Sequence, residues 1–570
     1  VSDFVKNTAR CKGEASVNNS FKQWFRKGEP WVWLNAGAVA ICVVMVVGLL
    51  GLVAVRGLAH FWPHTIIQAT YTESDGSQYK LIGEVADEEW VAASRVRDSG
   101  VEIPEDVKVV KRMQIKTGNR DISGLDFRWL IAENLTDITT PEEVMLVERR
   151  EWGNLYGYLR QVKESGNVVA SDAEALPEFE QRLERALSVF EQIREIENGE
   201  IGTINYEVER LRLQERGLAL KGELTEQAKA EIEAAKQEQD DLYQALKGKL
   251  DDLNTQISRD SVVLETMEGT EKEVPLKLIV QYKQPNGLSW FQKVADYFHQ
   301  VWLFLTEDPR EANTEGGVFP AIFGTVLMVI IMSILVTPFG VITAVYLREY
   351  AKQGLLTRTI RIAVNNLAGV PSIVYGVFGL GFFVYFTGGS IDDIFYPEAA
   401  PAPVFGTPGL MWASITLAIL TLPVVIVATE EGLTRIPKSL REGSLALGAT
   451  KFETIWKVIL PMSSPAMMTG LILAVARAAG EVAPLMLVGV VKLAPTLPLD
   501  GNFPYLHLER KFMHLGFHIY DVGFQSPNVE AARPLVYATA FLLVLVIVLL
   551  NLTAIMIRNR LREKYRALET

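Results

Sequence analysis

Arg477 and Glu481 are the residues whose type and spacing point most directly to chemistry. They interrupt Met462–Val491, a run that is otherwise free of charge. A charged side chain inside a bilayer costs roughly 2.5–3.5 kcal/mol on insertion scales, so such a residue is usually functional. A spacing of four places both residues on one face of a helix, where opposite charges neutralise each other. We interpret them as a pair facing a substrate path; a structural pair that locks helices together is the alternative.

A second functional segment is the polar loop Glu442–Thr450, which continues to Val458–Pro461. A helix, a turn of small residues, an amphipathic run and Leu-Pro follow one another between two long apolar segments. This order predicts a helix-turn-helix presented at a membrane surface for a partner to bind, and an ordinary loop is the alternative. Gly448 is expected to make the turn, because glycine accepts left-handed backbone angles freely.

Sites for other chemistry are missing from the sequence. No Gly-x-x-x-x-Gly-Lys-Ser/Thr segment is present, so the chain does not hold ATP by the P-loop route. No cofactor is expected in this chain, and any ATP hydrolysis belongs to a partner. His514 and His518, with His507 upstream, could share a metal if they lie on a helix. Surface histidines are the simpler interpretation, and we predict no metal site.

The elements that position these residues are six apolar segments. Each supplies about 20 apolar residues, enough to cross roughly 30 Å of hydrocarbon. The runs are Trp31–Val55, Val318–Leu347, Ile362–Ser390, Gly409–Thr429, Met462–Val491 and Pro534–Ile557. We therefore predict an all-α polytopic membrane protein: an anchor helix over 31–59, then a five-helix core over 318–557 with a cytoplasmic loop at 430–461.

Basic residues predict the orientation, since positive loops stay in the cytoplasm. They gather in the N-terminal segment 1–30, in the loop after the second span, in the loop 430–461 and in the tail 558–570, whereas 391–408 contains no Lys or Arg. Both termini are therefore expected inside. Cys11 falls in the cytoplasmic segment and Cys42 in the first span, so no disulfide is available outside. The net charge of −12 is concentrated outside and argues against nucleic acid.

The segment 60–317 is predicted to be an extracytoplasmic domain of mixed structure. Strands are expected at 64–72, 79–85, 107–115, 144–149 and 274–282. Apolar residues recur every three or four positions between 176 and 267. This periodicity favours a helical hairpin with arms of about 40 residues, or roughly 60 Å; a coiled coil that dimerises is the alternative. The aromatic-rich segment 290–304 is expected to be a helix lying along the membrane interface.

Several of these motifs resemble those of one transporter family. The segment 442–461 is similar to the "EAA" coupling loop of ABC importer permeases. Its first residue is Glu442, its glycine position is Gly448, and its last residues are Leu460 and Pro461. The segments 346–351, 366–376 and 476–485 resemble phosphate-specific permeases, and the last of these resembles the A-type subunit. Gly443, Ser444, Val458 and Val482 depart from the usual residues. The resemblance covers roughly 302–570 and excludes the insertion.

The resemblance implies a heteromeric importer in the bacterial inner membrane, with a MetI-like permease core. Its expected partners are a second, related permease subunit, two ATPase subunits, an extracytoplasmic phosphate-binding protein, phosphate and the lipid membrane. The chain itself would be a transport subunit and not an enzyme. A permease for another oxyanion or small solute stays open as an alternative, as does a membrane-anchored coiled-coil scaffold or sensor.

Overall fold

The computed structural model describes residues 24–73, 75–98, 103, 107–267, 269–352, 354–526 and 529–565. Within these residues, six helices are long and apolar enough to cross a membrane. They are Glu29–Ala59, Phe319–Tyr350, Ser372–Phe395, Leu410–Arg435, Lys451–Gly480 and Ala532–Glu563. The predicted number and order of spans are confirmed. Cys11 and most basic residues of the predicted N-terminal segment lie outside the described residues.

The bundle is built around α9 (Phe319–Val345), α13 (Leu410–Arg435), α16 (Leu460–Gly480) and α19 (Val529–Tyr565). Glycines let these helices approach closely. A Cβ at Gly340 of α9 would lie 2.5 Å from Val425 of α13, and one at Gly432 of α13 would lie 2.4 Å from Ala466 of α16. Such contacts matter in lipid, where van der Waals packing replaces the hydrophobic effect between helices.

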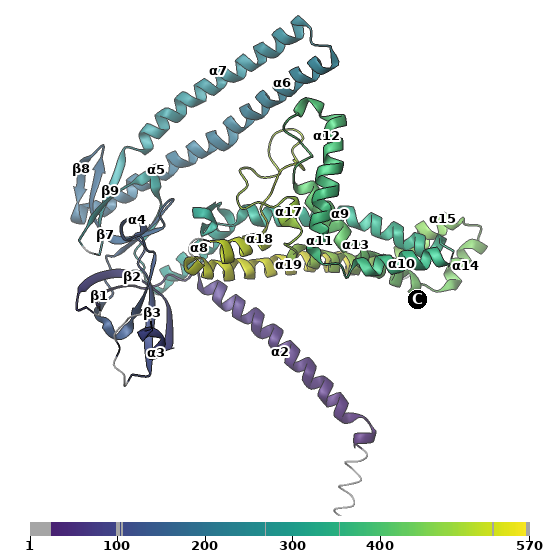
Figure 1. Cartoon of the computed structure of the whole chain (residues 1–570), viewed down its shortest axis with the longest axis horizontal. Coiled ribbons are helices and arrows are strands. Elements are labelled where there is room, and N and C mark those ends of the chain that lie inside the picture. The colour runs from purple at the N-terminus through teal and green to yellow at the C-terminus, as the bar shows by residue number, and fades with distance from the viewer. Residues whose placement is uncertain are drawn as a thin grey trace, which may run out of the picture.

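The first helix, α2 (Glu29–Ala59), stands apart from the bundle (Figure 1). Its apolar central window is not buried against any other part of the chain. It meets α19 near its end, where a Cβ at Gly57 would lie 2.8 Å from the carbonyl oxygen of Tyr537. We call the end of the bundle where α2 finishes and α9 begins the insertion end. The opposite end, where α13 finishes and α16 begins, is the coupling-loop end.

The third predicted span, 362–390, is wrong as a single helix. The chain forms an amphipathic helix α10 (Leu355–Leu367), breaks over 368–371, and starts again at Ser372. The break has a local cause, because Pro371 lacks an N–H and disfavours helical angles at Val370. The span that follows is α11 (Ser372–Phe378), a π-helical segment (Gly379–Gly388) and α12 (Gly389–Phe395).

The insertion contains two large antiparallel sheets and a short ladder between β12 (Pro309–Arg310) and β13 (Glu315–Gly316). The first has the order β4 (Phe127–Ile131), β3 (Val109–Lys116), β2 (Gln78–Ala92), β1 (Ile66–Thr72) and β5 (Leu135–Thr139). The second has the order β10 (Glu271–Pro275), β9 (Asp260–Glu265), β7 (Asn154–Glu164), β6 (Met145–Arg149) and β11 (Ile279–Lys283), with β8 (Asn167–Ser171) beside β7. The single strand predicted at 274–282 is wrong: a 3-10 turn at Leu276–Leu278 divides it after Pro275, which cannot donate to a ladder.

A long helical hairpin leaves the second sheet. Its first arm is α5 (Ala175–Glu195), a π turn (Ile196–Glu200) and α6 (Ile201–Lys221), and its second arm is α7 (Glu226–Ile257). Gly222, at φ 71°, makes the turn between the arms. The base is anchored because Phe179 and Leu183 of α5 are buried against the second sheet. The first arm has 47 residues and extends about 70 Å, whereas α7 has 32 residues and extends about 48 Å, so the two arms lie on either side of the predicted length. The predicted hairpin range 176–267 wrongly includes β9.

The hairpin runs back above the bundle (Figure 1), and α6 contacts the 3-10 turn Pro397–Ala399 that follows α12. Two side chains of α6 contact separate loops of the core. The Tyr206 hydroxyl donates to the carbonyl of Phe503, and the Arg216 guanidinium donates to the carbonyl of Ala400. A third element, α8 (Trp290–Thr306), joins the β-domain to α9 and exposes Trp290, Phe291, Phe298 and Trp302. The helix predicted there is present, and its position at the interface stays a prediction.

Candidate translocation path and coupling loop

Arg477 and Glu481 are brought together, but not by one helix. The helix α16 ends at Gly480, and Glu481 has extended backbone angles (φ −80°, ψ 131°). Arg477 Nε lies 3.5 Å from Glu481 Oε1, with side chains 33% and 22% exposed. The predicted continuation of this span to Val491 is therefore wrong. Gly480 and Pro484 stand on either side of the break, and both weaken a helix.

The link after α16 packs tightly against the third span. A Cβ at Gly376 of α11 would lie 2.7 Å from Pro484 Cα. The short helix α17 (Leu485–Val488) follows, with Leu485 and Val488 fully buried. Ala478 and Ala479 are also fully buried, so the small residues beside Arg477 face protein. The ion pair thus lies where α16 ends and the chain turns against α11.

We call the segment 438–454, which resembles the loop described above, the coupling loop. It consists of two short helices with a glycine turn between them. The first, α14 (Lys438–Ala446), carries Glu442, which is exposed. Gly448 has φ 87°, the left-handed conformation expected from the sequence. The second, α15 (Lys451–Thr454), begins with a capping box between Thr450 and Glu453. It continues through a π turn into α16, where Leu460 and Pro461 form the first turn.

The coupling loop exposes large apolar side chains. Leu447 is 91% exposed, and Leu445, Phe452 and Trp456 are exposed as well. Phe452 and Trp456 stack with their ring centroids 6.2 Å apart. Exposed apolar groups that gather on one short segment are typical of a protein interaction site.

Arg441 connects this loop to two spans, which the sequence analysis did not foresee. Its Nη1 donates to the carbonyl of Ile436 at 2.8 Å, and its Nη2 donates to that of Leu433 at 2.8 Å. Nη2 also lies 2.9 Å from Glu349 Oε1, in the π turn (Tyr346–Tyr350) that ends α9. Lys451 Nζ donates to the backbone carbonyl of Glu349. The opposite charges of Arg441 and Glu349 were visible in the sequence, but their 92-residue separation hid the contact.

The three histidines are buried, so the interpretation as surface residues is wrong. His514 and His518 lie on or beside α18 (Leu515–Tyr520), and burial lowers the pKa of each to about 4. His507 lies 3.0 Å from Asp500 and 3.1 Å from Glu509. Across the described part of the chain, no three His, Cys, Asp or Glu side chains are grouped closely enough to hold a metal ion.

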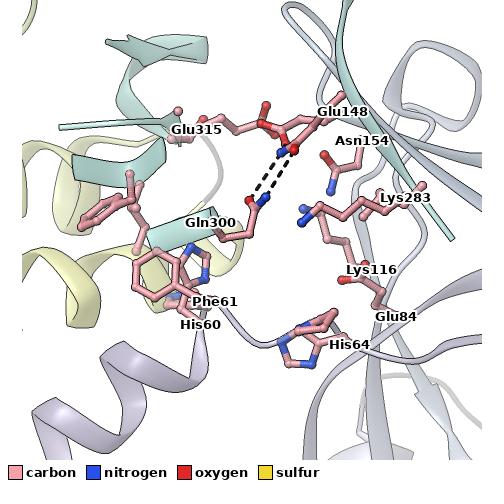
Figure 2. Close-up of a pocket in the computed structure, with 18 of the residues that line it drawn as sticks. His60, Phe61, His64, Glu84, Lys116, Glu148, Asn154, Lys283, Gln300 and Glu315 are labelled. Atoms are coloured by element: carbon pink, nitrogen blue, oxygen red, sulfur yellow. Dashed lines mark hydrogen bonds between the residues drawn. The ribbon is translucent and has the colours of Figure 1, made fainter. Parts of the chain in front are cut away.

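A polar cavity of about 270 Å³ lies where the β-domain meets α2, α8 and α19. Figure 2 shows Lys116, Lys283 and Gln300 pointing into this space. Burial alone would lower the pKa of Lys116, but nearby carboxylates, chiefly Asp126 and Glu315, outweigh it and raise that pKa. Burial raises the pKa of Glu315 to about 7. The cavity contains charges of both signs and lies outside the bundle, so we do not assign it to the translocation path.

Comparison with known proteins places the core in a family. A family described as "Binding-protein-dependent transport system inner membrane component" matches residues 336–566. The phosphate transport system permease protein PstA 1 of Mycobacterium tuberculosis (strain CDC 1551 / Oshkosh) is 35% identical over 247 residues, covering 43% of this chain and 71% of that protein. The chain belongs to the PstA family of phosphate transport permeases. The resemblance read from its motifs is confirmed.

Other relatives and a solved structure each match between a third and a half of the chain. The PstA protein of Yersinia pestis is 32% identical over 253 residues, 44% of this chain and 76% of that one. The probable ABC transporter permease protein YqgH of Bacillus subtilis is 34% identical over 202 residues, 35% of this chain and 61% of that one. A structure of the MetNI methionine ABC transporter, 20% identical, covers 46% of this chain and 98% of its own with a TM-score of 0.32.

Proposed function

We propose that the chain is a permease subunit of an ATP-driven importer of inorganic phosphate and forms half of its translocation pore. The observation that carries this proposal is the identity of 35% with a phosphate transport permease over 71% of that protein's length. A second, related permease would complete the pore. ATP would be bound and hydrolysed by two separate ATPase subunits.

The coupling loop is the proposed docking site of an ATPase subunit. Its exposed Leu447, Phe452 and Trp456 supply the apolar surface that such a contact needs. Arg441 supports the next step, because it joins α14 to the ends of α13 and α9. A movement of the loop on closure of the ATPase dimer would therefore move two spans together, as in the rigid-body transitions of other switching proteins.

Arg477 is the proposed contact for the phosphate ion inside the membrane. A guanidinium attracts an oxyanion, and Glu481 beside it weakens that attraction, which helps because a transported ion must also leave. The break in α16 supports this assignment, since unwound helices commonly form solute sites in transporters. A purely structural role for the pair is the alternative.

The insertion is proposed to lie outside the cell, where a phosphate-binding protein delivers its cargo. The distribution of basic residues supports this orientation. The hairpin lies over the insertion end and contacts the core loops at Ala400 and Phe503. A binding protein that docks on the core would therefore also meet the hairpin.

Two experiments test these proposals. Uptake of labelled phosphate should require both this chain and a partner ATPase with an intact P-loop, and excess sulfate or molybdate should not compete. Competition by either oxyanion would reassign the substrate. Reporter fusions at residues 200 and 520 should be external and those at 355, 440 and 568 internal; a cytoplasmic reporter at 200 would overturn the orientation.

A further inference from the structure

A cavity of about 570 Å³ opens at the coupling-loop end of the bundle. It lies between the last turn of α13, the first turns of α16 and the end of α19, beside the root of the coupling loop. Its walls combine two kinds of side chain. Arg435, Arg558 and Arg562 supply three guanidinium groups, and Leu440, Met462 and Pro465 are among its apolar residues.

The three arginines that line the cavity lack acidic partners. No Asp or Glu lines the cavity. Among the residues that the structure describes, none of the three has a carboxylate within ion-pair distance, and the one hydrogen bond from them is from Arg558 to Asn559 Oδ1 at 3.5 Å. Two other arginines at this end are paired, Arg361 with Glu430 at 3.0 Å and Arg441 with Glu349 at 2.9 Å. The preference of basic residues for one side of a membrane explains their presence. What distinguishes these three is that they line one cavity together with apolar side chains.

Three like charges around one cavity repel one another until an anion occupies it. Guanidinium groups match the oxygens of a phosphate group in pairs, which makes phosphate the favoured anion. A free phosphate ion would fill little of the cavity and would leave its apolar wall facing water. A phospholipid uses both parts, because its phosphate meets the arginines and its glycerol and upper acyl carbons meet the apolar side chains. Basic pockets between helices at the cytoplasmic membrane surface are known to suit acidic headgroups.

We propose that this cavity binds the headgroup of an anionic phospholipid from the leaflet at the coupling-loop end. With the orientation proposed above, on which this inference rests, that leaflet is the cytoplasmic one. The bound lipid would join the ends of α13, α16 and α19 at the point where the coupling loop begins. The site would therefore make coupling sensitive to the acidic lipid content of the membrane.

The test measures lipid binding directly, apart from transport. The full chain is purified in detergent with any subunits that accompany it, and native mass spectrometry follows titration with dioleoyl phosphatidylglycerol or dioleoyl phosphatidylcholine. We expect the first lipid to bind and the second to bind weakly. The double variant Arg435→Gln with Arg562→Gln should weaken phosphatidylglycerol binding roughly tenfold or more, since each cation near a membrane surface contributes appreciably. The matched control Arg560→Gln, on the same helix but not lining the cavity, should leave binding unchanged.

Two further binding measurements test the proposal. The double variant Arg435→Lys with Arg562→Lys retains the charges and should bind more phosphatidylglycerol than the glutamine double variant does, which separates lost attraction from lost folding. Inorganic phosphate at millimolar concentration should not displace the lipid. Equal binding of the two lipids, unchanged binding in the glutamine double variant, or displacement by inorganic phosphate would each overturn the proposal. Equal binding of the two lipids by a chain that still supports phosphate uptake would refute this inference and leave the proposed function standing.

Discussion

Arg441 on the coupling loop and Glu349 at the end of the first core span form an ion pair with Nη2 and Oε1 2.9 Å apart. Their side chains are 19% and 12% exposed, so water screens the pair only partly. The same guanidinium also binds two carbonyls at the end of α13. One side chain therefore connects the proposed ATPase docking site to two membrane spans.

Glu349→Gln should uncouple the transporter. The change leaves Arg441 without its charged partner, and we expect a stability loss of roughly 1–3 kcal/mol. We also expect ATP hydrolysis by the assembled complex to continue while phosphate uptake falls. Glu430→Gln is the matched control, because it breaks the similar Arg361–Glu430 pair, which joins α10 to α13 and does not involve α14 or α15. Equal loss of uptake in both variants would contradict a special role for Glu349.

Gly448→Asp should leave the protein in the membrane and abolish uptake. The residue has φ 87°, and a Cβ there would meet nothing within 4 Å, so the cost is conformational and not steric. A side chain in this conformation costs about 1 kcal/mol. Gly448→Asn should retain more uptake than Gly448→Ala, because asparagine tolerates left-handed angles better than alanine does. Normal transport by the aspartate variant would show that the loop is not the coupling element.

The pair in the membrane is tested by three variants. Arg477→Gln or Glu481→Gln alone should impair phosphate uptake without preventing assembly. Each single variant leaves one charge without its partner in a low-dielectric environment, which lowers stability. The double variant relieves that cost, so it should assemble fully and still fail to transport. Uptake assays and membrane abundance measured together separate these effects. Recovery of both in the double variant would mean that the pair is structural.

The hairpin can be shortened without damaging the β-domain. Replacing 206–245 with a short glycine linker removes the contacts of Tyr206 and Arg216 but keeps α5 and β9, which are buried in the second sheet. We expect normal assembly and a higher concentration of binding protein for half-maximal uptake. The double variant Tyr206→Phe with Arg216→Gln should show the same shift to a smaller degree. If assembly, uptake and regulation are all unchanged, the hairpin has no part in transport.

Glu315→Gln should change how stability depends on pH. The pKa of Glu315 is raised from 4.5 to about 7, so between these values the folded state holds a proton that the unfolded state has lost. Its contribution to stability is therefore complete below pH 4.5 and is lost as pH rises to 7. Glutamine cannot ionise, so the free energy of unfolding of the variant should rise relative to that of the parent between pH 4.5 and pH 7, by at most about 3 kcal/mol. Thermal unfolding in detergent at pH 5 and pH 8 measures the difference.

A control for that prediction has the opposite sign. Hydrogen bonds from Lys163 and Ser261 lower the pKa of Glu273. Glu273→Gln should therefore lose stability relative to the parent at pH values above that pKa. A Glu315→Gln variant that behaves in the same way would contradict the assignment of Glu315 as a carboxyl disfavoured by burial.

The membrane core was largely predictable because its signal is local and strong. Runs without charge, such as 410–429, identify a span from composition alone. The breaks were not predicted, although Pro371 and Gly480 mark them, because a hydrophobic run conceals a short interruption. In the insertion, β7 was missed although it pairs with its sequence neighbours β6 and β8. The strand β9 was missed because its six residues fall inside the range predicted to be a helical hairpin. The contact between Arg441 and Glu349 depends on how α9 and α13 pack, which no local pattern contains.

The separation of α2 from the bundle has a consequence for bilayer thickness. Its 31 residues extend about 46 Å, whereas the hydrocarbon layer measures roughly 30 Å. Because α2 meets α19 close to Gly57, its remaining length is free to tilt about that contact. A thinner membrane would increase the tilt and a thicker one would reduce it, at a cost of only fractions of a kcal/mol per Å of mismatch. The anchor thus adapts to the membrane while the five-helix core keeps its packing.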